Sequence, residues 1–527
     1  MNNDVVYHQR TARRSWLAFA SAFCLCVTAV PCLAATMDRG SSAATGFEDV
    51  VAKARALAQK PFEAPGRDLP DVLKKMGYDE WRGIRFKPAR SLWAEAPFSV
   101  QFFHPGFLYQ HPVTIHYVDR NGTHQAPFSA DLFDYESATL KGRLPEDHGF
   151  AGFRVHYPLN TPKYADELVS FLGASYFRAL GRDLAYGMSA RGLAVNTAED
   201  TGEEFPLFRE FWIVRPAAGA KSITLYALLD SDSVAGAYTF TVIPGEETQV
   251  KVNSVLFIRQ HIQKLGVAPL TSMFFYGENS GFRGDSDFRP EVHDSDGFQV
   301  FARSGEWIWH PLVDPQRLLI NAFGGGQPAG FGIMQRDINF DHYQDLEARY
   351  ERRPSVWVAP VGDWGQGHLE LVQLPTATEY NDNIVAYWVP ERALEPGDTV
   401  RYAYSLFWHS ARFPRSPQGY VAATRIVKKA DGAMFLVDFE GGELKTVYAQ
   451  KALEPDVWVS RGARITGTQL IRNTVTGGWR LVVHVHWDDP GFIEGLLPNQ
   501  RPAVEFRAFL KDGAVAVTET WSYTYLP

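Results

Sequence analysis

Acidic, aromatic and histidine side chains are concentrated between residues 271 and 310 of the chain. They fall in three short runs, Thr271–Ser280, Arg289–Gly297 and Gly305–His310. The apolar stretches between them are typical of strands, and loops carried by rigid strands are a common location for binding and catalytic groups. A charged turn without any chemical role explains the same composition, so this pattern alone leaves both interpretations open.

A second polar cluster, Glu379–Asn383, comes directly before the apolar run Ile384–Trp388. Its aspartate, Asp382, stands between two asparagines at the start of a predicted strand. Asparagine amides can hold such a carboxylate in place by hydrogen bonds, or the cluster can be an ordinary turn. The spacing does not decide between these two interpretations.

Other motifs give no support for phosphate or metal chemistry. Gly324–Gly326 is followed by glutamine and proline, without the lysine of a phosphate-binding loop, which indicates a flexible turn. His484 and His486 share one face of a strand, but no third metal ligand is indicated, and the nearby Trp479 and Trp487 point to packing. The sequence contains neither a Gly-x-Ser-x-Gly elbow nor a His-Glu-x-x-His motif.

The first 35 residues have the order of a cleavable export signal. Basic residues including Arg13 and Arg14 come first, the apolar run Trp16–Val30 follows, and small residues end the segment near Ala34. Because the apolar run is shorter than the roughly 20 residues that a membrane-spanning helix needs, we predict a signal peptide over residues 1–35. The adjacent arginines resemble a twin-arginine signal, which exports folded proteins; an ordinary secretory signal is the alternative.

Cysteine content and charge narrow the possible functions. All three cysteines lie in this segment, so the remaining chain has no disulfide, thiol nucleophile or cysteine metal site. The chain carries a net charge of −8, and residues 1–35 hold three arginines against one aspartate, so the rest is more acidic still. This charge argues against nucleic acid or an anionic membrane as a partner. Aromatic residues, 14% of the chain, fill cores first, but they can also stack on sugar rings.

Short apolar runs and turn residues, typical of strands, make up most of the chain. We expect two helices, one beginning at Thr45, where Glu48 completes a capping box, and one from Ala165 to about Leu180. The chain lacks a regular alternation of strands and helices, which argues against a parallel α/β sheet. We therefore predict an all-β fold with a few helices. The clearest predicted strands are Phe98–Phe103, Val113–Val118, Ser222–Leu229, Ala237–Ile243, Gln249–Ile258, Gly297–Ala302, Gly367–Gln373 and Ile384–Val389.

A domain boundary is predicted in the polar, proline- and serine-rich segment His409–Gly419. We place it after residue 412, which gives an N-terminal domain of residues 36–412 and a C-terminal domain of residues 413–527. Short strands at this spacing are typical of an immunoglobulin-like sandwich. The strands predicted in the C-terminal part are Thr424–Lys428, Met434–Phe439, Trp479–His486, Ala503–Leu510 and Ala514–Tyr525.

Ten segments follow one another in the second half of the chain: Pro269–Phe274, Tyr276–Asn279, Arg289–Glu291, His293–Ser295, Gly305–Trp309, Gln335–Arg336, Arg349–Tyr350, Arg353–Ser355, Asn381–Trp388 and Glu519–Tyr523. In this order they resemble the periplasmic glucan biosynthesis proteins G and D (OpgG/OpgD, also called MdoG/MdoD). The twin-arginine-like start is similar to the D branch. The resemblance implies a large N-terminal β-sandwich of the galactose-mutarotase type followed by an immunoglobulin-like sandwich. It also implies a periplasmic protein that acts on glucans with β-1,2-linked glucose backbones.

The resemblance extends to individual site residues. The two catalytic aspartates of the family fall on Asp294 and Asp382, and family binding residues fall on Tyr350 and Glu379. An inverting glycosidase needs one carboxyl to protonate the leaving oxygen and a second to activate water, about 6.5–9.5 Å apart. We assign Asp382 as general acid and Asp294 as general base. Because the acid must be protonated at neutral pH, we expect Asp382 to be buried beside Tyr350 and Glu379.

Further substrate contacts are predicted around these four residues. Arg289 and His293 lie in the same matching segments as Asp294. Several tryptophans offer rings on which an acceptor sugar can stack: Trp307, Trp309 and Trp388, with Trp357 and Trp364 as further candidates. The chemistry requires no metal and no organic cofactor.

The predicted function is cleavage of β-1,2-glucan during periplasmic glucan biosynthesis, with water or a sugar hydroxyl as the acceptor. One alternative is a non-catalytic glucan-binding or assembly factor that acts beside a membrane glucosyltransferase. Another is a mutarotase-like sugar epimerase, for which no matching histidine–glutamate motif is present. The partners expected are β-1,2-glucan, a functional link to a membrane glucosyltransferase, and a second copy of the chain in a homodimer; an integral membrane protein is not expected.

Overall fold

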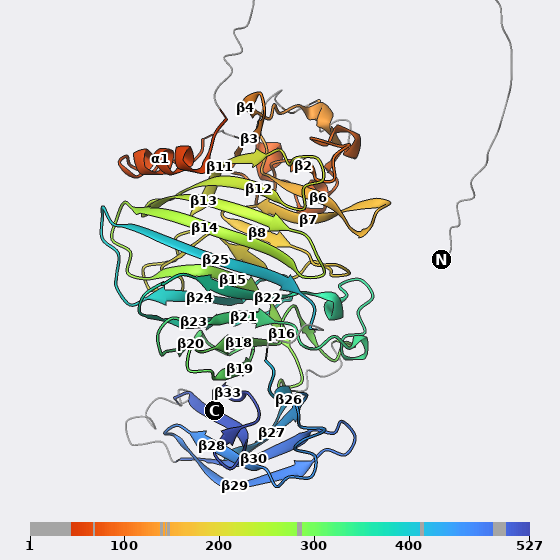
Figure 1. Ribbon diagram of the computed structural model, residues 1–527, viewed down its shortest axis with the longest axis vertical. Coiled ribbons are helices and arrows are strands. Elements are labelled where there is room, and N and C mark those ends of the chain that lie inside the picture. The colour runs from red at the N-terminus through yellow and green to blue at the C-terminus, as the bar shows by residue number, and fades with distance from the viewer. Residues whose placement is uncertain are drawn as a thin grey trace, which may run out of the picture. The chain divides into compact units, whose positions relative to one another are not determined.

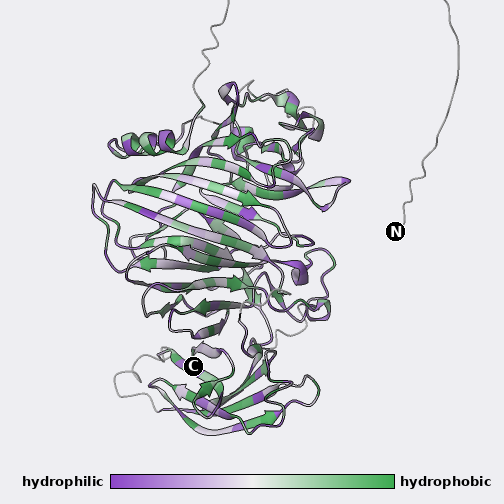
Figure 2. Ribbon diagram, in the orientation of Figure 1, coloured by the Kyte–Doolittle hydropathy of each residue, from purple (hydrophilic) through white to green (hydrophobic). Residues whose placement is uncertain are grey.

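β-Sheet dominates the computed structural model of this protein (Figure 1). The structure describes residues 44–66, 69–136, 141–142, 144, 148–281, 287–411, 416–488 and 502–527. The predicted signal peptide, residues 1–35, lies outside the described residues. Hydrophobic and hydrophilic positions are interspersed along the strands (Figure 2), as expected for sheets that are covered on one face. The predicted all-β class with a few helices is confirmed.

Two large sheets carry most of the strands among the described residues. The first has ten strands in the order β2 (Ser99–Phe103), β6 (Gly152–Thr161), β7 (Tyr164–Leu172), β8 (Tyr176–Ala179), β9 (Ser189–Arg191), β15 (Leu265–Ser272), β24 (Ile384–Pro390), β23 (Gly367–Gln373) and β20 (Leu319–Phe323), with β10 (Ala194–Val195) paired to β15.

The second large sheet has fifteen strands among the described residues. Their order is β28 (Glu454–Val459), β31 (Val504–Asp512), β33 (Thr520–Tyr525), β19 (Trp307–Pro311), β18 (Gly297–Phe301), β21 (Gly330–Met334), β22 (Ser355–Val361), β25 (Thr399–His409), β14 (Thr248–Ile258), β13 (Val234–Ile243), β12 (Ile223–Asp230), β11 (Leu207–Val214), β3 (Thr114–Asp119) and β4 (Gly122–Gln125), with β32 (Val515–Ala516) paired to β31.

Smaller elements complete the described fold. Three further sheets pair β1 (Arg85–Phe86) with β5 (Phe133–Asp134), β16 (Phe274–Tyr276) with β17 (Val292–His293), and β26 (Tyr420–Lys429) with β27 (Gly432–Glu440), β30 (Trp479–Trp487) and β29 (Ala463–Arg472). The helices are α1 (Phe47–Ala58), α2 (Asp71–Lys74) and α3 (Tyr78–Arg82), with short 3₁₀ turns η1 (Pro88–Arg90), η2 (Ala130–Leu132), η4 (Phe340–His342) and η5 (Tyr350–Arg352).

The main core lies between the two large sheets. Phe171 on β7 and Phe240 on β13 meet there with ring centroids 5.1 Å apart, and both are fully buried. On the other face of β12, β13 and β14 lies α1, the helix predicted near Thr45. Its residues Val50, Val51 and Ala54 pack in a separate apolar cluster on that face. Strands covered on both faces explain why the β13 burial pattern is continuous at its start. The predicted capping box of Thr45 and Glu48 is wrong by one residue: the N-cap is Gly46, whose N–H donates to Oδ2 of Asp49 at 2.8 Å, whereas the Thr45 hydroxyl pairs with that of Thr123.

The helix predicted from Ala165 to about Leu180 is wrong. This segment forms the hairpin β7–β8, in which Phe171 pairs with Phe177. Gly173 and Ala174 adopt positive φ angles of +80° and +41°, so the chain turns at the centre of the predicted helix. Val169, Phe171, Phe177 and Ala179 stand at alternate positions of the two strands and pack in the main core, and pairing of β7 with β6 decides in favour of the strand.

The C-terminal residues build a second sandwich. The sheet β26–β27–β30–β29 faces β28, β31 and β33 across a core in which Phe435 and Phe506 lie 4.6 Å apart. The predicted division after residue 412 falls in residues 412–415, outside the described part, and stays a prediction. The sequence did not predict that β33 pairs in parallel with β19, which joins this C-terminal strand to the second large sheet.

Candidate active site

Asp294 is placed by the small β16–β17 ribbon and by the strand that follows it. Its backbone N–H donates to the carbonyl of Met273 at 2.9 Å, directly before β18 begins. One carboxylate oxygen, Oδ1, lies 3.4 Å from Nε of Arg353. Burial raises the pKa of Asp294 above its ordinary value, the Arg353 guanidinium opposes this shift, and the negative charge of Asp382 adds to it. The two predicted aspartates therefore interact electrostatically.

Asp382 is placed by its neighbour Asn383. The buried Asn383 side chain accepts a hydrogen bond from the Phe274 N–H at 2.9 Å and donates to the carbonyls of Phe274 and Leu374 at 2.9 and 3.0 Å. The Asn383 backbone N–H donates to the Ser272 carbonyl at 3.1 Å. The Asn383 side chain thus anchors the loop through the backbone of Phe274 and Leu374. Of the two interpretations of the cluster, these bonds are those of an anchored turn and not of an amide that holds the Asp382 carboxylate. Because Met273 anchors Asp294, both aspartate segments are fixed to the same stretch of chain.

The expectation that Asp382 is buried is wrong. Asp382 is exposed, as are Tyr380 and Asn381 beside it, whereas Asn383 is buried. The physical reason is the anchor itself: one amide side chain satisfies the backbone groups below the loop, and the residues before it project outward. Of the two aspartates, Asp294 is the one enclosed by protein, with 13% of its side chain exposed.

Tyr350 and Glu379, which were expected beside Asp382, contact each other near Asp294. The hydroxyl of the buried Tyr350 donates to Oε2 of Glu379 at 3.4 Å. Burial raises the pKa of Tyr350, and the charges of Glu379 and Asp294 act in the same direction. The Arg353 guanidinium lies 5.3 Å from the centre of the Tyr350 ring. Tyr350 and Arg353 therefore border Asp294 together.

Arg289 forms an ion pair with Glu379. Its Nη1 lies 2.7 Å from Oε2 of Glu379 and 3.1 Å from Oδ2 of Asp345, and its other nitrogens bind Asp287. The Asp287 hydrogen bond raises the pKa of the guanidinium further, which burial opposes. With three carboxylates around it, Arg289 holds Glu379 in place and has little capacity left to bind a substrate directly.

His293 is a support and not a substrate contact. It is fully buried, so the prediction that it binds substrate is wrong in this structure. Nε2 lies 3.0 Å from Oε2 of Glu291, and Nδ1 lies 3.1 Å from Oε1 of Gln335. Burial lowers the pKa of His293, but the hydrogen bond and charge of Glu291 outweigh it, and the net shift is upward. Gln335 also donates to the Tyr350 carbonyl at 3.0 Å, which links the two segments that carry Asp294 and Tyr350.

The predicted tryptophan platforms are also wrong in this structure. Trp388 is fully buried in the main core. Trp307 and Trp309 are 8% and 4% exposed and belong to the apolar cluster of the C-terminal sandwich. The Trp309 ring is covered by the Arg336 guanidinium at 3.5 Å. Strand alternation places these rings inward, and none of the three offers a free face to a sugar.

Three side chains that the sequence did not indicate belong to the same electrostatic environment. Burial raises the pKa of both Tyr109 and Tyr176, and the charge of Asp382 contributes to each shift in the same direction. Arg178 lowers the pKa of Asp294 together with Arg353. Tyr176 and Arg178 lie on β8, inside the segment predicted as a helix. No local motif could have found them, because sheet pairing brings them to the site.

Comparison with known proteins identifies the family. The model of the family described as "Periplasmic glucan biosynthesis protein, MdoG" matches residues 46–525. The chain belongs to this family. Glucans biosynthesis protein G of Ralstonia nicotianae is 45% identical over 508 residues, which cover 94% of this chain and 99% of that protein. The resemblance and the periplasmic location predicted from the sequence are confirmed. The D-branch assignment and the twin-arginine signal stay predictions.

A structural comparison adds one distant likeness. The GalM/aldose epimerase homologue from C. elegans covers 49% of this MdoG-family chain and 91% of its own, with 10% identity and a TM-score of 0.19. That score is too low to carry an argument. Within the described part of the chain, no helix is long and apolar enough to cross a membrane.

One group of side chains in this MdoG-family protein has the composition of a cation site. Ligand atoms of Glu291, Asp337 and His342 all lie within 4.8 Å of one another. Each of them already has a protein partner: Glu291 binds His293, and His342 binds Asp337 through Nδ1. These pairings account for the cluster without an ion.

Proposed function

We propose that this protein cleaves β-1,2-glucosidic bonds with inversion at the anomeric carbon, using Asp382 as general acid and Asp294 as general base. The observation that carries the proposal is that the segments of both aspartates are hydrogen-bonded to the same stretch of chain, Ser272–Phe274, which brings Asp382 near the buried pair of Asp294 and Arg353. The charge of Asp382 accordingly raises the pKa of Asp294. Membership of the glucan biosynthesis family supplies the class of substrate. The β-1,2 linkage and the assignment of the two roles come from the sequence resemblance.

In the proposed reaction, Asp382 gives its proton to the glycosidic oxygen as the bond to the anomeric carbon breaks. Asp294 takes a proton from the attacking water or sugar hydroxyl on the opposite face. The environment of Asp294 fits a base: Arg353 favours its ionised form, and burial makes the carboxylate a better proton acceptor. Proton transfer through a water or a sugar hydroxyl extends the reach of either carboxyl.

Because Asp382 is exposed, the bound substrate must itself shield this carboxyl from water. A general acid works best when water is excluded, and here the loop Glu379–Asn383 leaves Asp382 open. We infer that the bound glucan chain covers this loop. The Glu379 carboxylate accepts a hydrogen bond from the Tyr350 hydroxyl and forms an ion pair with the Arg289 guanidinium. These contacts fix its position, so it can bind a sugar hydroxyl.

Incubation of the purified protein with linear β-1,2-glucan, followed by mass spectrometry of the products, tests the proposal. Hydrolysis gives shorter glucans, each cleavage adding one water, whereas transfer gives rings or rearranged chains without added water. Either outcome supports the proposal. Binding of the glucan with no new product contradicts it and favours a non-catalytic assembly factor that acts beside a membrane glucosyltransferase.

A further inference from the structure

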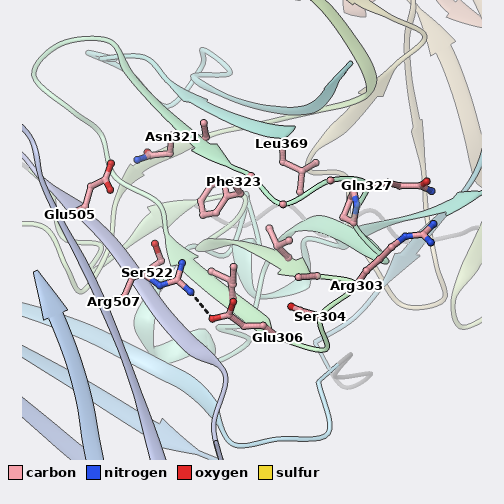
Figure 3. A pocket seen from close by; sticks show the side chains of 18 of the residues that line it. Arg303, Ser304, Glu306, Asn321, Phe323, Gln327, Leu369, Glu505, Arg507 and Ser522 are labelled. Atoms are coloured by element: carbon pink, nitrogen blue, oxygen red, sulfur yellow. Dashed lines mark hydrogen bonds and ion pairs between the residues drawn. The ribbon is translucent and has the colours of Figure 1, made fainter. Parts of the chain in front are cut away.

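A cavity lies between the β18–β19 turn and β20 on one side and the C-terminal strands β31 and β33 on the other. It encloses about 290 Å³, and Figure 3 shows side chains that line it. Asp294 precedes β18, whereas this cavity is lined by Val300 near the other end of the strand and by the turn that follows it. Four residue steps of about 3.3 Å along β18 separate the two places by roughly 13 Å. None of the candidate catalytic residues lines the cavity.

The walls of the cavity are tied together by protein contacts. Oε1 of Glu306 accepts from Nη2 of Arg507 at 2.5 Å and from the Thr520 hydroxyl at 2.7 Å. On the other side, Nδ2 of Asn321 donates to the Thr524 hydroxyl at 2.7 Å. These bonds join the β18–β19 turn and β20 to β31 and β33. The cavity is therefore preformed, which lowers the cost of binding a ligand.

The charges in the cavity balance. Two guanidiniums, of Arg303 and Arg507, stand against two carboxylates, of Glu306 and Glu505. Arg303 and Glu505 are exposed, and within the described part of the chain their charged groups have no hydrogen-bonding or ionic partner. An anion or a cation would meet as much repulsion as attraction here. A neutral ligand with many hydroxyls finds both donors and acceptors.

The remaining lining is suited to a ring with an apolar face. Phe323 is half-buried, supported by Phe298 at 5.3 Å between ring centroids, and Leu369 lies beside it. The rim is formed by Gly324–Gly326, where a side chain on Gly325 would point into open space and φ is +111°. Gly324–Gly326, which the sequence predicted to be a flexible turn, has no side chains to cover its backbone amides at the cavity mouth. Apolar walls with a few placed polar groups characterise small-molecule sites of about 300–1,000 Å³.

We propose that this cavity is a second saccharide-binding site, which takes roughly one or two rings of a neutral sugar chain, apart from the catalytic aspartates. The identity of the sugar as a β-1,2-glucan rests on the proposed function. A polymer bound at this cavity stays close to the protein between catalytic events, which raises its effective concentration at Asp294 and Asp382.

Hydrogen exchange with sophorose, the β-1,2-linked glucose disaccharide, tests the proposal. The full protein carrying Asp382→Asn is compared with the same protein carrying Ser304→Trp in addition. Ser304 is exposed in the β18–β19 turn and lines the cavity, and its side chain makes no hydrogen bond within the described part of the chain, so the indole blocks the cavity without removing one. Ala516→Trp, at an exposed position on β32 outside the cavity, is the matched control.

We expect sophorose to slow exchange in residues 302–308 and 320–327, and we expect Ser304→Trp but not Ala516→Trp to abolish this protection. Unchanged exchange in these residues overturns the proposal, and so does protection that survives Ser304→Trp. Protection at residues 374–384 reports the catalytic loop separately, so failure of the second site and failure of the proposed function are distinguishable. Glucose 6-phosphate protecting the cavity more strongly than glucose would overturn the assignment of a neutral ligand.

Discussion

At the scale of single residues, the pair Asp294 and Arg353 defines the proposed base. The sequence found Asp294 and Asp382 because both lie in family segments, and Arg353 opens another such segment. It could not find Tyr176 and Arg178, which strand pairing brings in, or Tyr109, which lies between β2 and β3. It also misjudged exposure: His293 and the tryptophans are buried, and Asp382 is not, because exposure is decided by tertiary packing and not by residue type.

Removing Arg353 should change the pH dependence of turnover. Because its guanidinium lowers the pKa of Asp294, Arg353→Ala raises that pKa further, and the base is then ionised only at higher pH. The acid limb of kcat/KM against pH should move to higher pH. Arg352→Ala, whose guanidinium binds the carbonyl of Asp183 instead, is the control. An acid limb that stays in place in Arg353→Ala would show that Asp294 is not the titrating base.

Tyr350→Phe isolates the contact with Glu379. The change removes the 3.4 Å hydrogen bond and keeps the ring against Arg353. A single hydrogen bond contributes about 1 kcal/mol, so we expect a loss of kcat/KM of about fivefold with little change in melting temperature. Steady-state kinetics on linear β-1,2-glucan measures it. A loss as large as that of an aspartate variant would mean that Tyr350 takes part in proton transfer.

At the scale of elements, the hairpin β7–β8 shows what a sequence pattern can and cannot decide. Alternation predicted strands such as β13 and β14 correctly, because buried and less buried positions alternate along part of each strand. The hairpin was predicted as a helix, since several of its apolar residues recur at helical intervals and the turn at Gly173 is followed by an alanine. The error hid Tyr176 and Arg178, which this hairpin brings to the site.

Gly173→Ala should destabilise the protein through this turn. Its φ of +80° is strained for any L side chain, at about 1–2 kcal/mol, and the added Cβ would lie 3.2 Å from the Tyr109 ring. Gly202→Ala has a similar φ of +88° and open space around the Cβ, so it carries the backbone strain alone. Thermal unfolding should show a larger decrease for Gly173→Ala. Equal decreases would mean that the Tyr109 ring moves away without cost.

At the scale of the whole molecule, the contacts between the large sheets and the C-terminal strands include buried acids. The N–H of Thr424 donates to Oε1 of Glu278 at 3.0 Å, and Glu519 binds Arg336 through both oxygens. Burial raises the pKa of Glu278 to about 7, with Glu291 adding repulsion, and burial raises that of Asp296 to about 6. The sequence predicted two sandwiches but not these contacts, because they join residues far apart in the chain.

The raised pKa of Glu278 makes stability depend on pH. Its folded-state pKa lies above the ordinary value of 4.5, so its contribution to stability is complete below pH 4.5 and is lost as pH rises through about 7. Glu278→Gln, which keeps an acceptor for Thr424, should unfold at a higher temperature than the natural protein at pH 8 and at nearly the same temperature at pH 4.5. The exposed Glu391→Gln serves as control. A variant less stable than the natural protein at pH 8 would mean that ionised Glu278 is needed.

The central claim is that Asp294 and Asp382 carry out the chemistry on the glucan chain. The most direct measurement is turnover of linear β-1,2-glucan by Asp294→Asn and Asp382→Asn, with the exposed Asp200→Asn as a matched control. Each catalytic-site variant should lose about 10²–10⁴-fold in kcat while keeping the fold and the melting temperature of the natural protein, and Asp200→Asn should be unaffected. Near-normal turnover by both aspartate variants would contradict the account.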